Sequence, residues 1–209
     1  MEKIAIYGAG GFGKDIAFLL EVSSEQYELI GFFDDGVEKG SKIVGYEVLG
    51  GKDELSAFTG QLSVVFAINN GAVIKSIHEG ITNKNVSFPN IFHPRCVIDR
   101  NTLNIGIGNV FNIDVIISKD ATIGNFNSFN NRATIGHDVI IGDFNHFSPN
   151  VQISGGVKIG NHNLFGLNSS IIQYKKVGNN NKIGACSLVI RNVSDDSSVF
   201  GIPALISKF

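Results

Sequence analysis

Large apolar residues recur every six positions from residue 105 to residue 189, and this period organises the second half of the chain. Fifteen consecutive positions follow it: Ile105, Phe111, Ile117, Ile123, Phe129, Ile135, Ile141, Phe147, Ile153, Ile159, Phe165, Ile171, Val177, Ile183 and Val189. The phenylalanines in this column repeat every eighteen residues, and an asparagine stands two places before each of them and again at Asn181. Chance does not produce such a run, so the period is structural.

A period of six predicts a solenoid with three short faces in each coil. Each hexapeptide supplies one strand and one corner, and three hexapeptides close a triangular coil. Successive coils then pair as parallel strands about 4.8 Å apart, with the apolar column inside. The fifteen hexads predict five coils, with the phenylalanines stacked along one edge and the asparagines as a ladder beside them.

Residues 3 to 90 follow a different pattern, in which apolar runs alternate with segments of helical period. Strands are expected in "KIAIYG", "YELIGFFDD" and "LSVVFAI", and helices in "GKDIAFLLE" and "GAVIKSIHEGI". The first helix has Ile16, Leu19 and Leu20 on one face. This order predicts a parallel sheet with crossover helices, and the prolines of "FPNIFHP" mark its end. The predicted domains are therefore residues 1–90 and 91–209.

Gly8, Gly10 and Gly13 form a GxGxxG pattern directly after the first strand, and the second strand ends in Asp34 and Asp35. In a dinucleotide-binding fold, backbone N–H groups and a helix N-terminus hold phosphates while an acid binds the ribose. An alternative is that the glycines only make a tight turn between strand and helix. About ninety residues are too few for a complete NAD-binding domain, which favours a mononucleotide.

Composition excludes several classes of function. The net charge of -2 and the pI of about 6.2 give no basic surface for nucleic acid. There is also no lysine-arginine cluster of the kind that binds anionic lipid. Cys96 and Cys186 lack the CxxC spacing of a zinc site and indicate no disulfide framework. The N-terminus is typical of a strand and glycine turn, and no apolar run reaches membrane-spanning length. We therefore expect a cytoplasmic protein without membrane insertion.

The motifs "YGAGGFG", "FFDD", "IFHPRCVI", "IGHDVIIGDFNHFSPNVQISGGVKIG" and "GIPA" occur in this order over essentially the whole chain. Together with the six-residue repeat, they resemble the hexapeptide-repeat sugar acetyltransferases. That family includes UDP-4-amino-sugar N-acetyltransferases and proteins linked to sialic acid O-acetylation. The resemblance implies an α/β N-terminal Rossmann-like half domain followed by an all-β left-handed parallel β-helix. It also implies acetyl-CoA as co-substrate and a homotrimer with active sites between neighbouring prisms.

The resemblance implies roles for individual residues. His137 matches the general base that removes a proton from the sugar amine, and Asp138 matches the acid that orients its ring. The backbone N–H of Gly155 is expected to stabilise the oxyanion of the thioester. The residues expected to contact acetyl-CoA are His146, Gly155, Leu167 and Ala185. The residues expected to contact the nucleotide sugar are Gly10, Gly11, Phe12, Asp34, Asp35 and Asn69.

Three of these positions depart from the pattern of one similar family member. Asp138 replaces a glutamate, so its shorter side chain reaches the histidine ring differently. Phe12 replaces a histidine and Asn69 replaces a glycine. These two changes are compatible with a different base, a different sugar or a substrate that is not a nucleotide.

A metal site formed by three histidines, His137, His146 and His162, is a further alternative. Their spacings do not resemble those of the carbonic-anhydrase β-helix, and carboxylates that would suit as partners are sparse, so we expect no metal. His93 and His162 are more typical of corner residues that bond to the backbone.

We therefore expect an acetyl-CoA-dependent N-acetyltransferase that acts on a nucleotide-activated amino sugar of the UDP-4-amino-sugar type, in surface polysaccharide or glycan biosynthesis. Transfer in this family is direct, so neither cysteine is expected to be a nucleophile. Three alternatives stay open: a sugar or sialic acid O-acetyltransferase, a non-catalytic regulatory trimer that binds nucleotide sugar, and an NAD-binding protein that assembles through its β-helix.

Overall fold

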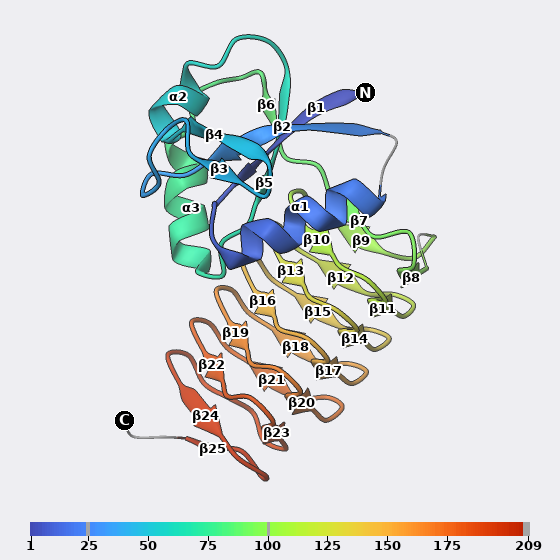
Figure 1. The fold of residues 1–209 in the computed structure, drawn as a ribbon. Coiled ribbons are helices and arrows are strands. Elements are labelled where there is room, and N and C mark those ends of the chain that lie inside the picture. The colour runs from blue at the N-terminus through green and yellow to red at the C-terminus, as the bar shows by residue number, and fades with distance from the viewer. Residues whose placement is uncertain (24–25, 100, 207–209) are drawn as a thin grey trace. The chain divides into compact units, whose positions relative to one another are not determined.

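The computed structural model describes residues 1–23, 26–99 and 101–206 (Figure 1). The chain divides into two compact units, Met1–Ile91 and Phe92–Phe209, which we call the N-terminal unit and the solenoid unit. The division falls within "FPNIFHP", where the prolines lack the N–H groups that regular structure requires.

The N-terminal unit is a largely parallel sheet whose strands are joined by helices. The strand order is β3-β4-β2-β1-β5-β6, and β3 runs antiparallel to β4. The strands are β1 (Glu2–Tyr7), β2 (Tyr27–Phe33), β3 (Lys42–Ile43), β4 (Tyr46–Gly50), β5 (Leu62–Phe66) and β6 (Val86–Ser87), and the helices are α1 (Gly11–Ser23), α2 (Lys52–Ser56) and α3 (Gly71–Gly80). The predicted face of α1 is confirmed, because Ile16, Leu19 and Leu20 are buried. None of the helices in the described part of the chain is long and apolar enough to cross a membrane.

The solenoid unit has three parallel faces, and each residue pairs with the residue about eighteen positions further along, as Phe111 does with Phe129. Face 1 consists of β7 (Ile91–Phe92), β10 (Val110–Phe111), β13 (Ser128–Phe129), β16 (His146–Phe147), β19 (Leu164–Phe165), β22 (Lys182–Ile183) and β24 (Ser198–Phe200), with β25 (Leu205–Ile206) antiparallel at its end. Face 2 consists of β8 (Val97–Ile98), β11 (Ile116–Ile117), β14 (Thr134–Ile135), β17 (Gln152–Ile153), β20 (Ser170–Ile171) and β23 (Leu188–Val189). Face 3 consists of β9 (Asn104–Ile105), β12 (Thr122–Ile123), β15 (Ile140–Ile141), β18 (Lys158–Ile159) and β21 (Lys176–Val177). These sheets and the N-terminal α/β unit confirm the predicted fold class.

The predicted apolar column lies inside the solenoid and forms its core. The prediction of five coils underestimated the length of the solenoid, because Phe92 and Val199 extend face 1 beyond the two ends of the repeat. The six-residue period fails at both ends. Ile98 and Ile105 are seven residues apart, and Val199 pairs with Ile183 only sixteen residues before it. A strict period therefore finds the centre of the solenoid and misses its irregular ends.

Two ladders run along the inside of the solenoid, as the sequence predicts. The phenylalanine rings of face 1 stack in parallel, with centroids 4.8 Å apart for Phe111 and Phe129. In the asparagine ladder, Nδ2 of Asn127 donates to Oδ1 of Asn109 over 3.0 Å and to the carbonyl oxygen of Gly142 over 2.9 Å. These buried amides are bonded to the coils on both sides, so the ladder fixes the register between coils.

The corners of the solenoid share one backbone conformation. The third residue after each column residue has a positive φ at nearly every corner, which turns the chain sharply. The residues in this conformation between 114 and 186 are Asp114, Asp120, Phe126, Arg132, Asp138, Phe144, Asn150, Gly156, His162, Asn168, Tyr174, Asn180 and Cys186. We number the corners by the faces that they join: corner 1 joins faces 3 and 1, corner 2 joins faces 1 and 2, and corner 3 joins faces 2 and 3.

Candidate active site

His137 and Asp138 lie together at corner 3, between the end of β14 and the start of β15. Nδ1 of His137 is 2.7 Å from Oδ2 of Asp138. A carboxylate only accepts hydrogen bonds, so Nδ1 carries the proton and Nε2 keeps its lone pair. The two side chains are 59% and 66% exposed, so this corner is open to a ligand. The positive φ of 57° at Asp138 is tolerated because aspartate adopts this conformation more readily than most residues.

Gly155 lies one coil beyond His137, and its backbone supports the imidazole ring. A Cβ built on Gly155 would stand 2.5 Å from Nε2 and 2.7 Å from Cε1 of His137. No side chain fits there unless the ring moves. The N–H of Gly156 donates to the backbone carbonyl oxygen of His137 over 2.8 Å, and this bond holds the two coils together next to the ring. The ring of His137 therefore rests on a bare stretch of backbone.

The N–H of Gly155 has no hydrogen-bond acceptor among the residues that the structure describes. The equivalent N–H groups at corner 1 do have acceptors, because Asn and Asp side chains of the next coil accept hydrogen bonds from them. For example, Oδ1 of Asp143 accepts from the N–H of Asn125 over 2.6 Å, and Oδ1 of Asn161 accepts from that of Asp143 over 2.7 Å. Corner 3 thus offers a backbone donor beside an imidazole that has a free lone pair. This pair can hold an oxyanion and accept a proton.

His146 lies on face 1 and is buried, with Nδ1 2.6 Å from Oγ of Ser128. Burial lowers the pKa of His146 to about 4, so the ring is neutral at physiological pH. A neutral buried ring can exchange hydrogen bonds with a ligand but does not take up a proton near pH 7. Its predicted contact with acetyl-CoA stays a prediction.

Leu167 and Ala185 occupy the same place in successive coils of corner 2, and both are exposed. In a three-faced prism, corner 3 lies opposite face 1, whereas corner 2 is one edge of that face. The structure therefore brings His137, Asp138 and Gly155 together, but not with His146, Leu167 or Ala185 of the same chain.

The glycine-rich loop between β1 and α1 contains two kinds of glycine. Gly8 has a φ of +118°, and a Cβ there would stand 2.7 Å from the carbonyl oxygen of Ala67. A Cβ on Gly13 would collide with the carbonyl oxygen of Gly8. By contrast, a Cβ on Gly10 or Gly11 would meet no described atom within 4 Å. Packing therefore explains Gly8 and Gly13, while Gly10 and Gly11 present open backbone at the start of α1, where a phosphate binds well.

Asp34 and Asp35 both bond within the N-terminal unit. Oδ2 and Oδ1 of Asp34 accept from the N–H groups of Ala9 and Gly36, each over 2.8 Å. Oδ1 of Asp35 accepts from the N–H of Lys52 over 2.8 Å, and Oδ2 accepts from the Tyr7 hydroxyl over 2.7 Å. Burial, followed by this bond, raises the pKa of Tyr7. The sequence pattern did not indicate that Asp34 and Asp35 hold the surrounding loops by hydrogen bonds. These bonds do not test the predicted contact of the two aspartates with a nucleoside.

The two aspartates also line an open cavity of about 260 Å³. Its lining residues are Asp34, Asp35, Val37, Lys39, Gly50, Gly51, Lys52, Asp53 and Glu54. The cavity combines carboxylates, two lysines and backbone groups, which suits a polar ligand. Phe12 lies in the first turn of α1, directly after the loop that begins at Gly8.

Asn69 is exposed and directly precedes the N-cap of α3. The cap itself is Asn70, whose Oδ1 accepts from the N–H groups of Ala72 and Val73. The two neighbouring asparagines therefore differ: the side chain of Asn70 starts the helix, while Asn69 stands beside it at the end of the loop.

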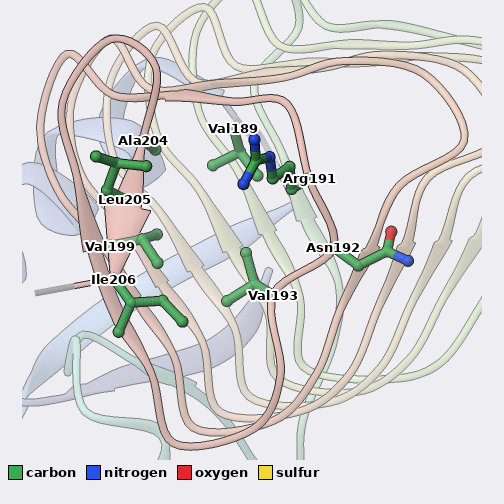
Figure 2. A pocket seen from close by; sticks show the side chains of 8 residues that line it. All are labelled: Val189, Arg191, Asn192, Val193, Val199, Ala204, Leu205 and Ile206. Carbon is green, nitrogen blue, oxygen red and sulfur yellow. The ribbon is translucent and has the colours of Figure 1, made fainter.

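A cavity of about 340 Å³ lies at the C-terminal end of the solenoid (Figure 2). Its lining residues are Val189, Arg191, Asn192, Val193, Val199, Ala204, Leu205 and Ile206. Figure 2 shows Val189, Val193 and Val199 pointing into it. These valines belong to the apolar core, so the cavity is the open end of that core. It lies several coils after the coil of His137. The three-histidine alternative is not assembled within one chain, since the described residues hold no group of three or more metal-binding side chains.

The N-terminal unit matches the family model described as the PglD N-terminal domain over residues 3–81. No curated protein matches the sequence. Among solved structures, the acetyltransferase domain of PglB from Neisseria gonorrhoeae, in complex with acetyl coenzyme A, is 27% identical, with 99% of each chain covered and a TM-score of 0.90. WeeI from Acinetobacter baumannii is also 27% identical, with 99% of this chain and all 100% of that chain covered and a TM-score of 0.87.

PerB from Caulobacter crescentus, in complex with CoA and GDP-perosamine, is 24% identical over 99% of this chain and 98% of that chain, with a TM-score of 0.90. At this identity the likeness bears on the fold alone. All three matches extend over both units, so the combination of a Rossmann-like half domain with a β-helix is shared as a whole.

Proposed function

We propose that this chain is a hexapeptide-repeat sugar acetyltransferase, which transfers the acetyl group of acetyl-CoA to the amine of a nucleotide-activated amino sugar. The single observation that carries the proposal is the arrangement of His137 at corner 3. Its Nδ1 bonds to Asp138, and the ring lies against the backbone of Gly155. The likeness to an acetyltransferase domain that binds acetyl coenzyme A supports the choice of donor.

The reaction that fits this corner is a direct transfer. The neutral amine nitrogen attacks the thioester carbon, and the carbonyl oxygen becomes an oxyanion that accepts a hydrogen bond from the N–H of Gly155. The nitrogen is then positively charged, and Nε2 of His137 removes one of its protons. The carbon–sulfur bond breaks as the carbonyl re-forms, and the CoA thiolate takes the proton from the imidazolium. The products are an N-acetyl sugar and free CoA, and the histidine is regenerated.

Asp138 is proposed as the positioning residue for His137. Its hydrogen bond of 2.7 Å holds the tautomer in which Nε2 is the base, and its charge stabilises the imidazolium. The shorter aspartate still reaches the ring, since its Oδ2 lies 2.7 Å from Nδ1 of His137. The replacement of glutamate by aspartate therefore does not remove the acid from the site.

A complete acetyl-CoA site requires a second copy of the chain in this proposal. His137 and Gly155 lie at corner 3, whereas His146 belongs to face 1 and Leu167 and Ala185 belong to corner 2. These groups lie on different sides of one prism, so a single ligand contacts both sets only in a cleft between two prisms. A homotrimer supplies three such clefts.

The nucleotide part of the acceptor is assigned to the N-terminal unit. Gly10 and Gly11 present open backbone at the N-terminus of α1, whose dipole favours phosphate. Phe12, Asp34, Asp35 and Asn69 are proposed to line the rest of this site. A UDP sugar is the first candidate, and the product belongs to surface polysaccharide or glycan biosynthesis.

The test is an acetyl-CoA consumption assay with a panel of UDP-, dTDP- and GDP-linked amino sugars. Release of free CoA with an amino sugar, and none with the matching sugar that has a hydroxyl in place of the amine, supports N-acetylation. Turnover of the hydroxyl sugar instead supports the O-acetyltransferase. Binding of nucleotide sugar without any turnover supports the regulatory trimer, and thermal stabilisation by NAD alone supports the dinucleotide-binding alternative.

A further inference from the structure

The acidic residues of the chain stop at Asp143 and resume only at Asp195. Residues 144–194 contain no aspartate or glutamate, although the whole chain has 19. The same segment contains five cationic side chains: Lys158, Lys175, Lys176, Lys182 and Arg191. It forms the C-terminal coils of the solenoid, whereas the coils before it carry charges of both signs. The C-terminal coils are therefore positively charged on a chain whose net charge is -2.

Three of these cations lie together where face 3 begins, and we call them the lysine patch: Lys158, Lys175 and Lys176. Lys158 of β18 and Lys176 of β21 are paired directly in the parallel ladder (Figure 1). Paired strands lie about 4.8 Å apart, and both of these side chains are exposed. The N–H of Lys158 donates to the carbonyl oxygen of Lys175 over 2.9 Å, which places the third lysine beside the pair.

The direct pairing of Lys158 with Lys176 is unfavourable for the sheet itself. Two like charges on neighbouring strands repel each other and destabilise the pairing. Within the described part of the chain, no residue of the lysine patch has an acidic partner. Thr122 and Ile140 hold the two preceding positions of the same row, so the solenoid accepts a neutral side chain there. The fold does not require this charged pair.

Lys175 occupies a position at which the preceding coils have a buried apolar residue. Ala121, Val139 and Val157 precede it at intervals of eighteen residues, and all three are fully buried. Lys175 is only half-buried, as expected when the hydrocarbon stem of a lysine covers apolar surface and its ammonium group stays at the surface. An apolar residue at this position buries more surface and favours folding more. Core packing therefore does not account for Lys175, and the charge of the patch points to an anionic ligand.

The lysine patch lies on the donor side of the proposed reaction centre. Lys158 follows Gly155 by three residues in the same coil, and Lys176 lies one coil further toward the C-terminus. Leu167 and Ala185, the residues assigned to the acyl donor, belong to the same part of the solenoid. CoA carries a diphosphate and a 3′-phosphate, and a phosphate monoester alone has a charge of about −1.5 to −2 near pH 7.

We propose that the lysine patch binds the phosphate groups at the adenosine end of CoA. This inference rests on the function proposed above, which names acetyl-CoA as the donor. From the thioester at Gly155, the pantetheine arm leads toward the C-terminal coils, where no carboxylate repels the phosphates. An ammonium group on a flexible stem binds phosphate as a point charge and needs no fixed geometry. The nucleotide sugar also has a diphosphate, but that group is assigned to Gly10 and Gly11 of the N-terminal unit.

The test measures the dissociation constant of CoA by isothermal titration calorimetry, without any amino sugar. The double variant Lys158→Gln/Lys176→Gln removes the paired charges from the outer surface and leaves the core untouched. We expect its Kd for CoA to rise about fivefold to tenfold, the loss expected for two solvent-exposed ion pairs. Lys176→Gln alone is expected to raise Kd by about threefold. The control Lys42→Gln/Lys84→Gln removes two exposed lysines of the N-terminal unit, and its Kd should match that of the wild type.

Titration with 3′-dephospho-CoA identifies which phosphate the patch binds. A smaller effect of the double variant on this ligand than on CoA supports the 3′-phosphate, and an equal effect supports the diphosphate. The melting temperature of the double variant should not fall, because the substitutions relieve a repulsion between like charges.

Equal Kd values of the double variant and the wild type for CoA overturn the proposal. A raised KM for the amino sugar with an unchanged Kd for CoA also overturns it, because the patch then binds the diphosphate of the acceptor. A wild-type protein that does not bind CoA contradicts the proposed function itself. CoA binding by the wild type therefore distinguishes a failure of the lysine patch from a failure of the proposed function.

Discussion

The α-carbon of Gly155 lies so close to the imidazole of His137 that a Cβ on this glycine would stand 2.5 Å from Nε2. The contact joins two successive coils and fixes the ring between its hydrogen bond to Asp138 and the bare backbone. A base held in this way loses little entropy when the substrate binds. The same glycine supplies the proposed oxyanion donor, so one residue serves both the proton transfer and the charge that develops on oxygen.

Gly155→Ala is predicted to inactivate the enzyme without unfolding it. The new methyl group displaces the imidazole, and we expect kcat to fall by roughly 10²–10⁴, the range for a lost general base. The double variant Gly155→Ala/His137→Ala is expected to be no slower than His137→Ala alone, because both changes remove the same function. If the loss of activation free energy in the double variant equals the sum of the losses in the two single variants, the glycine does not act through the histidine.

Asp138→Asn is predicted to lower kcat by roughly 10²–10⁴ while leaving the melting temperature nearly unchanged. Asparagine tolerates the left-handed backbone, but its neutral amide neither fixes the Nδ1–H tautomer nor stabilises the imidazolium. Asp138→Glu keeps the charge and should retain much of the activity. Equal activity of Asp138→Asn and the wild type would show that the bond to Nδ1 has no part in turnover.

The solenoid core offers a matched pair of adjacent residues. Ile141 is 2% exposed and belongs to the inward column, whereas Ile140 beside it is 43% exposed on the outer surface. Ile141→Asp buries an unpaired carboxylate and is predicted to destabilise the fold by more than about 4 kcal/mol, enough to prevent its formation. Ile140→Asp leaves the coil folded. Circular dichroism and thermal melting test both, and similar melting temperatures would mean that the column does not point inward.

Stability is predicted to fall in mild acid because of His146. Its pKa is about 4 in the folded chain and about 6.5 when unfolded. Between these values the unfolded state binds a proton that the folded state does not, so stability decreases as the pH falls from about 6.5 to 4. The shift corresponds to a loss on the order of 3 kcal/mol. Burial also lowers the pKa of His78 and His93, so they act in the same direction.

Urea titrations at pH 7.5, 5.5 and 4.5 measure this effect, and His146→Gln is the comparison. The variant cannot take up a proton, so its free energy of unfolding should fall less steeply with decreasing pH than that of the wild type. The relevant quantity is the slope rather than the stability at one pH, because the substitution itself perturbs a buried site. Identical slopes would mean that His146 is not the group that titrates.

Much of the fold follows from the sequence because its repeat is strict. A six-residue period from Ile105 to Val189 leaves one solution for the core, and the structure confirms that solution and the asparagine ladder. The ends were missed because the spacing changes to seven residues before Ile105 and to sixteen between Ile183 and Val199. Period alone contains no information about an irregular coil.

The site was harder to predict, because its geometry depends on contacts between coils. The sequence draws attention to His137 and Asp138 as an adjacent pair, but the support from Gly155 arises only when residues eighteen positions apart are stacked. The acids of the N-terminal unit show the opposite case. Asp34 and Asp35 stand where a nucleotide-binding acid is expected, yet their carboxylates also hold the surrounding loops. No local pattern distinguishes a ligand-binding acid from one that bonds to backbone.

The most direct test of the role of His137 is the turnover of acetyl-CoA by purified His137→Ala, measured beside the wild type with the amino sugar that the panel identifies. The variant is expected to keep the melting temperature and assembly state of the wild type while kcat falls by roughly 10²–10⁴. A correctly folded His137→Ala protein that releases CoA at the wild-type rate would contradict the proposed role of the imidazole.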